Sequence, residues 1–208
     1  MEVVLPNNVL CAGGYEINRG ACQGDSGGPL VCKGVAVGIV SFNYKNNLSR
    51  EKMSGKGTHG EEIINGQKAK ENSLQYMASV QYAGKHECGG FLIHPSYVLT
   101  AAHCYYSYKR EYLSVVLGSH NIDWKMNRLR RYLVESVYIY PSYRIPVLGS
   151  DIMLLKGDSG GPLVCNGVAV GIVSFNLHKN CQYPDVPNVY TEISAYADWI
   201  KKVIEADR

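Results

Sequence analysis

The sequence predicts an all-β protein, either a barrel or a sandwich, that is closed by one C-terminal helix. Short runs of β-branched and aromatic residues alternate with clusters of Gly, Pro, Asn and Ser, a pattern typical of strands joined by turns. Apolar residues at helical spacing occur only near the end of the chain. Because 46% of the 208 residues are hydrophobic, the chain can bury a core, and wholesale disorder is excluded.

Five runs are expected to be strands, because each is rich in β-branched and aromatic residues and is bounded by turn-forming residues. Within the fourth run, every second residue from Tyr132 to Tyr140 falls on one face, which is the period of a strand buried on one side. The five runs are Ala78–Tyr82, Gly90–His94, Leu113–Leu117, Tyr132–Tyr140 and Val168–Phe175.

The last predicted element is an amphipathic helix that begins near Ile193. Its apolar residues recur every three or four positions, and charged residues fill the opposite face. The apolar face comprises Ile193, Tyr196, Ala197, Ile200 and Val203 or Ile204, and the charged face comprises Asp198, Lys201, Lys202 and Asp207. In contrast, residues 44–62 are polar and aperiodic and are expected to form a linker.

Charge and cysteine content exclude several classes of protein. The 21 Lys and Arg residues and 18 Asp and Glu residues leave a net charge of +3, too small to indicate a nucleic-acid surface. No window approaches the roughly 20 apolar residues that cross a membrane, and residues 1–10 lack the features of a signal peptide.

The seven cysteines indicate disulfides and an oxidising compartment. No Cys/His spacing resembles a zinc motif, so we expect neither a metal nor a cofactor.

One segment of the chain occurs twice. Residues 24–43 read GDSGGPLVCKGVAVGIVSFN, and residues 157–176 repeat this sequence with Asn166 in place of Lys33. Two copies with unlike flanks do not make a solenoid, which needs about three stacked repeats. Two explanations stay open: a partial duplication or misassembled gene, or a working protein that uses both copies.

Three motifs carry side chains that suit acyl transfer. His103 ends one apolar run, Asp151 precedes another, and Ser159 lies in a glycine-rich turn. A serine hydroxyl is a weak nucleophile that needs an adjacent base, and imidazole accepts a proton near neutral pH. A buried carboxylate would orient the imidazole and stabilise its protonated form. The glycines of the turn let the N–H groups of Gly157 and Ser159 converge on a developing oxyanion.

Together these motifs resemble the chymotrypsin-like serine peptidases, and most closely their granzyme and mast-cell protease branch. His103 and Asp151 are 48 residues apart, close to the roughly 45 residues of the chymotrypsin triad. The resemblance covers residues 63–208 almost end to end and residues 7–43 a second time. Further matches are Ile63–Gly66 after two acidic residues, Cys88–Phe91, the Ser174–Phe175 pair and Pro187–Tyr190 before the terminal helix.

The resemblance implies a chymotrypsin-like double β-barrel with a C-terminal α-helix, and a serine endopeptidase that acts on peptide or protein substrates. In this family His103 would be the general base, Asp151 its orienting acid and Ser159 the nucleophile. The other implied roles are an oxyanion hole from Gly157 and Ser159, an activation pair of Ile63 and Asp158 after cleavage before Ile63, substrate contacts from Ser174, Phe175, Asn176 and Asn188, and a Cys88–Cys104 disulfide. The resemblance also implies a secreted or granule-stored protein.

The chain departs from the family pattern between Asp151 and Ser159. These residues are 8 positions apart, where the chymotrypsin triad has roughly 90. We therefore expect the second barrel to be incomplete. The chain divides into a partial duplicate with a linker at 1–62, a first barrel at 63–156 and a remnant of the second barrel at 157–208.

The first copy of the repeat keeps the approach to the serine that the second copy has lost. Ser26 is accordingly an alternative nucleophile, for which the resemblance implies Gly20 at the base of the specificity pocket and allows a Cys22–Cys181 bridge. We expect neither serine to be well placed in the uncleaved chain. Two functions stay open: a serine endopeptidase, and an inactive protease-like chain that at most binds peptides. The sequence predicts neither the physiological substrate nor the oligomeric state.

Overall fold

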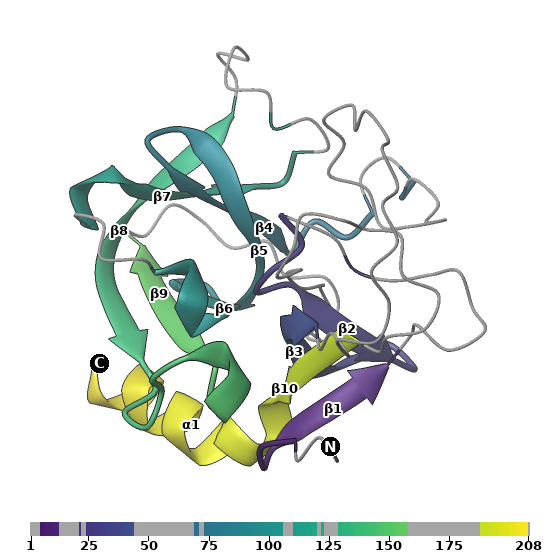
Figure 1. Ribbon diagram of the computed structural model, residues 1–208. Coiled ribbons are helices and arrows are strands. Elements are labelled where there is room, and N and C mark those ends of the chain that lie inside the picture. The colour runs from purple at the N-terminus through teal and green to yellow at the C-terminus, as the bar shows by residue number, and fades with distance from the viewer. Residues whose placement is uncertain are drawn as a thin grey trace, which may run out of the picture.

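The computed structural model describes residues 5–12, 21, 24–43, 69–70, 73–105, 110–119, 122, 129–157 and 188–207. Within this part of the chain the strands form one closed barrel and one open sheet, followed by an α-helix (Figure 1). The elements are β1 (Val9–Ala12), β2 (Pro29–Cys32), β3 (Val35–Asn43), β4 (Met77–Tyr82), β5 (Lys85–His94), β6 (Tyr97–Thr100), η1 (Ala102–Cys104), η2 (Arg110–Tyr112), β7 (Leu113–Leu117), β8 (Arg130–Ile139), η3 (Pro146–Leu148), β9 (Met153–Gly157), β10 (Asn188–Glu192), η4 (Ile193–Tyr196) and α1 (Ala197–Ala206).

The barrel closes in the order β4-β5-β6-β9-β8-β7, and its neighbouring strands are antiparallel. β4 and β5 form a hairpin over Ala83 and Gly84, whose φ angles of 49° and 82° suit a two-residue turn between twisted strands. Pairing across this turn starts β5 at Lys85, five residues before the predicted start at Gly90. β4, β7 and β8 lie within two residues of their predicted positions, whereas the predicted strand 168–175 lies outside the described residues.

The interior of the barrel is apolar. All four residues of β6 and the first three residues of β9 are buried. On β8, Val134 is 6% exposed and its neighbour Leu133 is 65% exposed, which confirms a strand with one buried face. The largest buried side chains of the barrel include those of Phe91, Leu99, Met153, Leu154 and Leu155.

The C-terminal helix packs against this barrel. The predicted helix begins as the 3₁₀ turn η4 and continues as α1, with Ile200, Val203 and Ile204 against the barrel's core cluster. The buried ring of Tyr196 meets Tyr140 edge-on, with ring centroids 4.8 Å apart. Among the described helices, none has the length and apolar character needed to cross a membrane.

The residue after α1 ties the end of the helix to the barrel. The carboxylate of Asp207 accepts hydrogen bonds from the hydroxyls of Tyr97 and Tyr138, and it lies 3.0 Å from Nζ of Lys156. These contacts hold the pKa of Asp207 below its ordinary value, chiefly because the Tyr97 hydroxyl donates to the charged form. Burial, together with the hydrogen bond to Asp207, raises the pKa of Tyr97.

The open sheet joins the two ends of the described chain. Its order is β1-β10-β3-β2, so N-terminal β1 and C-terminal β10 lie side by side (Figure 1). β2 and β3 come from the first copy of the repeat and form a hairpin over Lys33 and Gly34. The first copy of the repeat thus forms paired strands. Residues 168–176 of the second copy lie outside the described residues.

Among the described residues, the open sheet has a small core of its own and packs against the complete barrel. Its buried apolar cluster consists of Ala21, Val40 and Tyr190, whereas Ile39 of β3 belongs to the core cluster of the barrel and helix. The fold is therefore a chymotrypsin-like double barrel, in which the described residues form the first barrel completely and half of the second. This confirms the predicted fold class.

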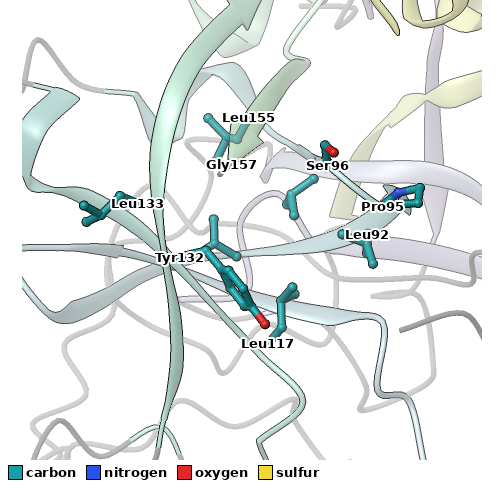
Figure 2. A pocket seen from close by; sticks show the side chains of 10 residues that line it. Leu92, Pro95, Ser96, Leu117, Tyr132, Leu133, Leu155 and Gly157 are labelled. Carbon is teal, nitrogen blue, oxygen red and sulfur yellow. The ribbon is translucent and has the colours of Figure 1, made fainter. Parts of the chain in front are cut away.

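A small cavity of about 30 Å³ lies in the barrel where β9 ends. Figure 2 shows the side chains around it, which include Leu92, Leu117, Tyr132 and Leu155 from four different strands. Gly157, the last residue of β9, lines the same cavity. β9 thus carries the chain into the far end of the barrel rather than across to the open sheet.

Candidate active site

Three separate segments bring polar side chains together between the barrel and the open sheet. His103 lies in η1, directly after β6, and is 8% exposed. Asp151 lies between η3 and β9 and is fully buried. Ser26 lies in the turn before β2 and is 1% exposed. The structure therefore brings together one predicted pair, His103 and Asp151, with the serine of the first copy.

The three side chains form a continuous line of hydrogen bonds. Nδ1 of His103 lies 2.7 Å from Oδ2 of Asp151, and Nε2 of His103 lies 2.9 Å from Oγ of Ser26. Because a carboxylate only accepts, Nδ1 must carry the ring proton, which leaves the lone pair of Nε2 to accept from the Ser26 hydroxyl. This arrangement can move a proton from Ser26 to the imidazole.

Asp151 is held by further hydrogen bonds. The backbone N–H of His103 donates to Oδ1 at 2.9 Å, and the hydroxyl of Ser41 donates to Oδ2. Thr191 Oγ1 donates to the backbone carbonyl of Asp151 at 3.1 Å. Sequence reasoning overlooked Ser41, although the repeat contains the signal: Ser41 matches Ser174, which the resemblance assigned to the substrate site.

The turn that carries Ser26 is packed tightly against the barrel. Gly27 has a φ of +78°, and a Cβ on it would lie 1.9 Å from Oγ1 of Thr100 and 2.6 Å from the carbonyl oxygen of Gly89. Only glycine fits both the backbone angle and the space. The N–H of Gly27 donates to the carbonyl of Val40, and that of Gly28 to the carbonyl of Asp25. These contacts fix Ser26 beside His103.

The sequence places this site in a known family. Residues 2–54, 63–157 and 155–200 match the family described as Trypsin. The chain belongs to the trypsin family. Similar proteins include granzyme B of Rattus norvegicus, chymase of Cavia porcellus and cathepsin G of Homo sapiens, with 27%, 28% and 26% identity. These alignments cover 71%, 70% and 72% of this chain and 93%, 92% and 90% of the respective proteins.

As a member of the trypsin family, the chain is classified with the serine proteases, whose substrates are peptides or proteins. The matched residues 2–54 include Ser26, and the matched residues 155–200 include Ser159. Of these two serines, the structure describes Ser26 alone. The expectation that neither serine would be well placed is wrong for Ser26, because the β3–β10 pairing and the close approach of Gly27 seat its turn against the barrel.

Gly157 lies away from the site. Its N–H donates to the carbonyl of Ser96 at 3.1 Å, and it pairs with Val134 of β8. This N–H is therefore used in the barrel, which differs from its expected role in an oxyanion hole. Asn188 starts β10, where its backbone lies opposite Ala12 and Asn43. The remaining predicted residues lie outside the described part of the chain: Gly20, Cys22, Ile63, Asp158, Ser159, Ser174, Phe175, Asn176 and Cys181.

The expected disulfide forms next to His103. Cys88 on β5 and Cys104 in η1 are bonded, with Cα atoms 6.2 Å apart. Their sulfur atoms and a ring nitrogen of His103 lie within 4.8 Å of one another, a cluster that could in principle hold a metal. Because both sulfurs are committed to the disulfide, they are not thiolate ligands. Among the described cysteines, Cys11 and Cys32 are free and exposed.

Proposed function

We propose that this chain is a serine endopeptidase in which Ser26 is the nucleophile, His103 the general base and Asp151 the orienting acid. The observation that carries the proposal is the hydrogen-bonded line from Ser26 Oγ through His103 to the buried Asp151 carboxylate. Triads are recognised by geometry and not by chain order, so a nucleophile that precedes its base in the sequence is allowed.

The choice of Ser26 over Ser159 rests on where β9 leads the chain. Thr100, three residues before His103, pairs with Met153 at the start of β9. Gly157, at the other end of β9, is roughly 13 Å further along the strand. Two more residues reach at most about 7 Å. Ser159 would therefore approach His103 only if β9 gave up part of its barrel pairing.

The proposed reaction follows the serine protease mechanism. Ser26 Oγ attacks the peptide carbonyl while His103 Nε2 takes its proton, and the buried carboxylate of Asp151 stabilises the imidazolium. His103 then returns the proton to the leaving amine, and water repeats the sequence on the acyl-enzyme. We assign the oxyanion donors to the N–H groups of Gly24 and Ser26, which match Gly157 and Ser159 in the other copy.

The other parts of the site are assigned in the same way, by replacing each residue of the second copy of the repeat with its equivalent in the first copy. Ser41, Phe42 and Asn43 on β3 match Ser174, Phe175 and Asn176, so we propose that the end of β3 supplies the backbone edge for an extended substrate. Cleavage before Ile63 would release an amino group, with Asp25 as its partner in place of Asp158. Gly20 at the base of the pocket favours a substrate side chain other than Lys or Arg.

We further propose that the chain enters the secretory route, as a secreted or granule-stored protein. The Cys88–Cys104 disulfide supports this, since structural disulfides persist in oxidising compartments. The three regions 1–62, 63–156 and 157–208 remain our proposed division of the chain, and Cys22–Cys181 our proposed link between the first and last of them.

The test is labelling with a fluorophosphonate probe, which reacts only with a serine activated by an assembled triad. The full-length chain is assayed before and after cleavage before Ile63, together with Ser26→Ala and Ser159→Ala. Labelling that survives Ser159→Ala and disappears with Ser26→Ala supports the proposal. Labelling lost with Ser159→Ala alone assigns the nucleophile to the second copy. Absence of labelling in every form supports the alternative, an inactive protease-like chain that at most binds peptides.

A further inference from the structure

The Cys88–Cys104 disulfide lies directly against His103. The two sulfur atoms and a ring nitrogen of His103 lie within 4.8 Å of one another, and all three residues are buried. In the disulfide form the sulfurs are not thiolates, and a thiolate is the form of cysteine that binds metal. Reduction of this one bond would leave two thiols and an imidazole in the same place.

Other contacts hold the cluster together without the disulfide. Cys88 lies on β5, which is paired with both β4 and β6 of the closed barrel. Next to it, the carbonyl of Gly89 accepts a buried 2.7 Å hydrogen bond from Oγ1 of Thr100, the last residue of β6. η1, which carries His103 and Cys104, begins two residues later. The three side chains therefore stay close after reduction, because the barrel itself joins β5 to η1.

The donor set of the reduced cluster suits zinc. Thiolate sulfur and imidazole nitrogen are ligands that zinc prefers, whereas Mg²⁺ and Ca²⁺ take oxygen. Zinc bonds of about 2.3 Å to sulfur and about 2.0 Å to nitrogen place tetrahedral ligand atoms roughly 3.5–3.8 Å apart, inside the 4.8 Å span of the cluster. Two thiolates also cancel the charge of the ion, so the buried site is neutral. The fourth position is left to water, as in open zinc sites.

We propose that reduction of the Cys88–Cys104 disulfide creates a zinc site with Cys88, His103 and Cys104 as ligands, and that zinc bound there switches off Ser26. The switch rests on the proposed function, whereas the zinc site itself does not. Zinc on Nε2 takes the lone pair that accepts from Ser26. Zinc on Nδ1 displaces the hydrogen bond to Asp151 and moves the ring proton to Nε2. Either arrangement removes the base that a serine nucleophile needs.

The reductant of this switch is a dithiol. One of its thiolates attacks the protein disulfide, and its second thiol closes the dithiol to a cyclic disulfide, so two electrons and two protons pass to the sulfurs of Cys88 and Cys104. Zinc then replaces the two thiol protons, which go to the buffer. Because the disulfide and zinc compete for the same two sulfurs, the chain is active in an oxidising compartment and inactive in a reducing one that supplies zinc.

The first measurement is protection of thiols from alkylation, read by peptide mass spectrometry. The full-length chain is reduced with dithiothreitol, freed of it without oxygen, and treated with iodoacetamide with and without Zn²⁺. Zn²⁺ buffered at about 1 μM should slow alkylation of Cys88 and Cys104 at least about tenfold, which corresponds to a Kd of about 0.1 μM, the weak end of structural zinc sites. Mg²⁺ should not protect them. Cys11 and Cys32, which are free and exposed, are the internal reference and should react at an unchanged rate.

The histidine ligand is tested with His103→Ala, and His94→Ala is the matched control. Both variants lose an imidazole, but His94 is the last residue of β5 and lies outside the cluster. Protection should need at least about tenfold more zinc in His103→Ala, since even groups that merely orient a ligand are worth about 10- to 100-fold in affinity. In His94→Ala the zinc dependence should be unchanged.

The second measurement is fluorophosphonate labelling of the oxidised and the reduced chain. Zn²⁺ at about 1 μM should lower labelling of the reduced chain at least about tenfold, and a chelator should restore it. The oxidised chain should label equally with and without zinc, because its sulfurs are occupied. Labelling of the double variant Cys88→Ser, Cys104→Ser should not respond to zinc under reducing conditions.

The outcomes separate the zinc site, the switch and the proposed function. Equal alkylation of Cys88 and Cys104 with and without zinc overturns the site whether or not the chain labels. So does a reduced chain that circular dichroism shows to be unfolded, because the barrel must hold the cluster. Equal protection in His103→Ala and His94→Ala removes the histidine ligand and with it the switch. Protection without loss of labelling overturns the switch alone. An oxidised chain that never labels overturns the proposed function and the switch, while alkylation still decides the zinc site.

Discussion

Replacement of Gly27 by alanine should disable the Ser26 turn while leaving the barrel folded. The new Cβ would lie 1.9 Å from Oγ1 of Thr100, so the turn must retreat by roughly 1.5 Å to reach ordinary van der Waals contact. Such a retreat takes Ser26 Oγ out of its 2.9 Å hydrogen bond with His103. Misplacement of a reacting group by about 1 Å costs on the order of 100-fold in rate. We therefore expect fluorophosphonate labelling to fall at least about 100-fold.

Gly34→Ala is the matched control. Gly34 lies in the turn of the β2–β3 hairpin that follows Gly27, and it also has a positive φ, of +82°, but a Cβ on it would have no neighbour within 4 Å. This variant should lose about 1–2 kcal/mol of stability, because alanine disfavours a left-handed backbone. It should nevertheless label at close to the wild-type rate. Comparing the two variants therefore separates the steric effect at Gly27 from the effect of the backbone angle.

Two results would refute this reasoning. If Gly27→Ala labels as fast as Gly34→Ala, the turn is not held against Thr100 as the structure shows. If instead labelling is lost with Gly160→Ala, the corresponding glycine of the second copy, then the reactive serine is Ser159. Circular dichroism and thermal unfolding of each variant establish whether the barrel is still folded.

Three further predictions concern the triad, the disulfide and the end of the C-terminal helix. Asp151→Asn should lower fluorophosphonate labelling by about 10³- to 10⁴-fold, because an amide holds the imidazole in the wrong tautomer. The thermal midpoint should be unchanged. Near-normal labelling would contradict the triad. Joint replacement of Cys88 and Cys104 by serine should lower the free energy of unfolding, measured with denaturant, by about 3 kcal/mol, as expected for a closed loop of this length. A decrease below about 1 kcal/mol would show that the disulfide contributes little to stability. The Tyr97 hydroxyl lowers the pKa of Asp207, so this contact stabilises the fold above the ordinary aspartate pKa and is lost as the pH falls through the lowered value. The melting temperatures of wild type and Asp207→Asn should therefore converge on acidification from pH 6 to pH 3, and a constant difference would refute this linkage.

Much of the fold can be predicted from local patterns in the sequence. Alternation of buried and exposed residues marks β8, and the three-to-four spacing marks α1, because these periods arise from the backbone geometry of one element at a time. His103 and Asp151 could also be nominated from their flanking apolar runs. The start of β5 at Lys85 could not, since that part of the strand is ordered by pairing with β4 and carries no apolar pattern of its own.

The sequence alone determined that the chain carries a histidine, an aspartate and two equivalent serines of one protease family. It could not determine which serine meets His103, because the two copies differ at one position, and Lys33 occupies that position in an exposed hairpin turn. The tertiary structure decides which serine lies beside His103, through the connectivity of the chain and the pairing of its strands. β3 pairs with β10 and seats Ser26 beside His103, 77 residues away, whereas β9 is drawn into the first barrel between β6 and β8 and takes Gly157 with it. The equivalent residues Gly24 and Gly157 thus acquire different surroundings, because contacts between distant segments depend on where the chain enters and leaves each copy.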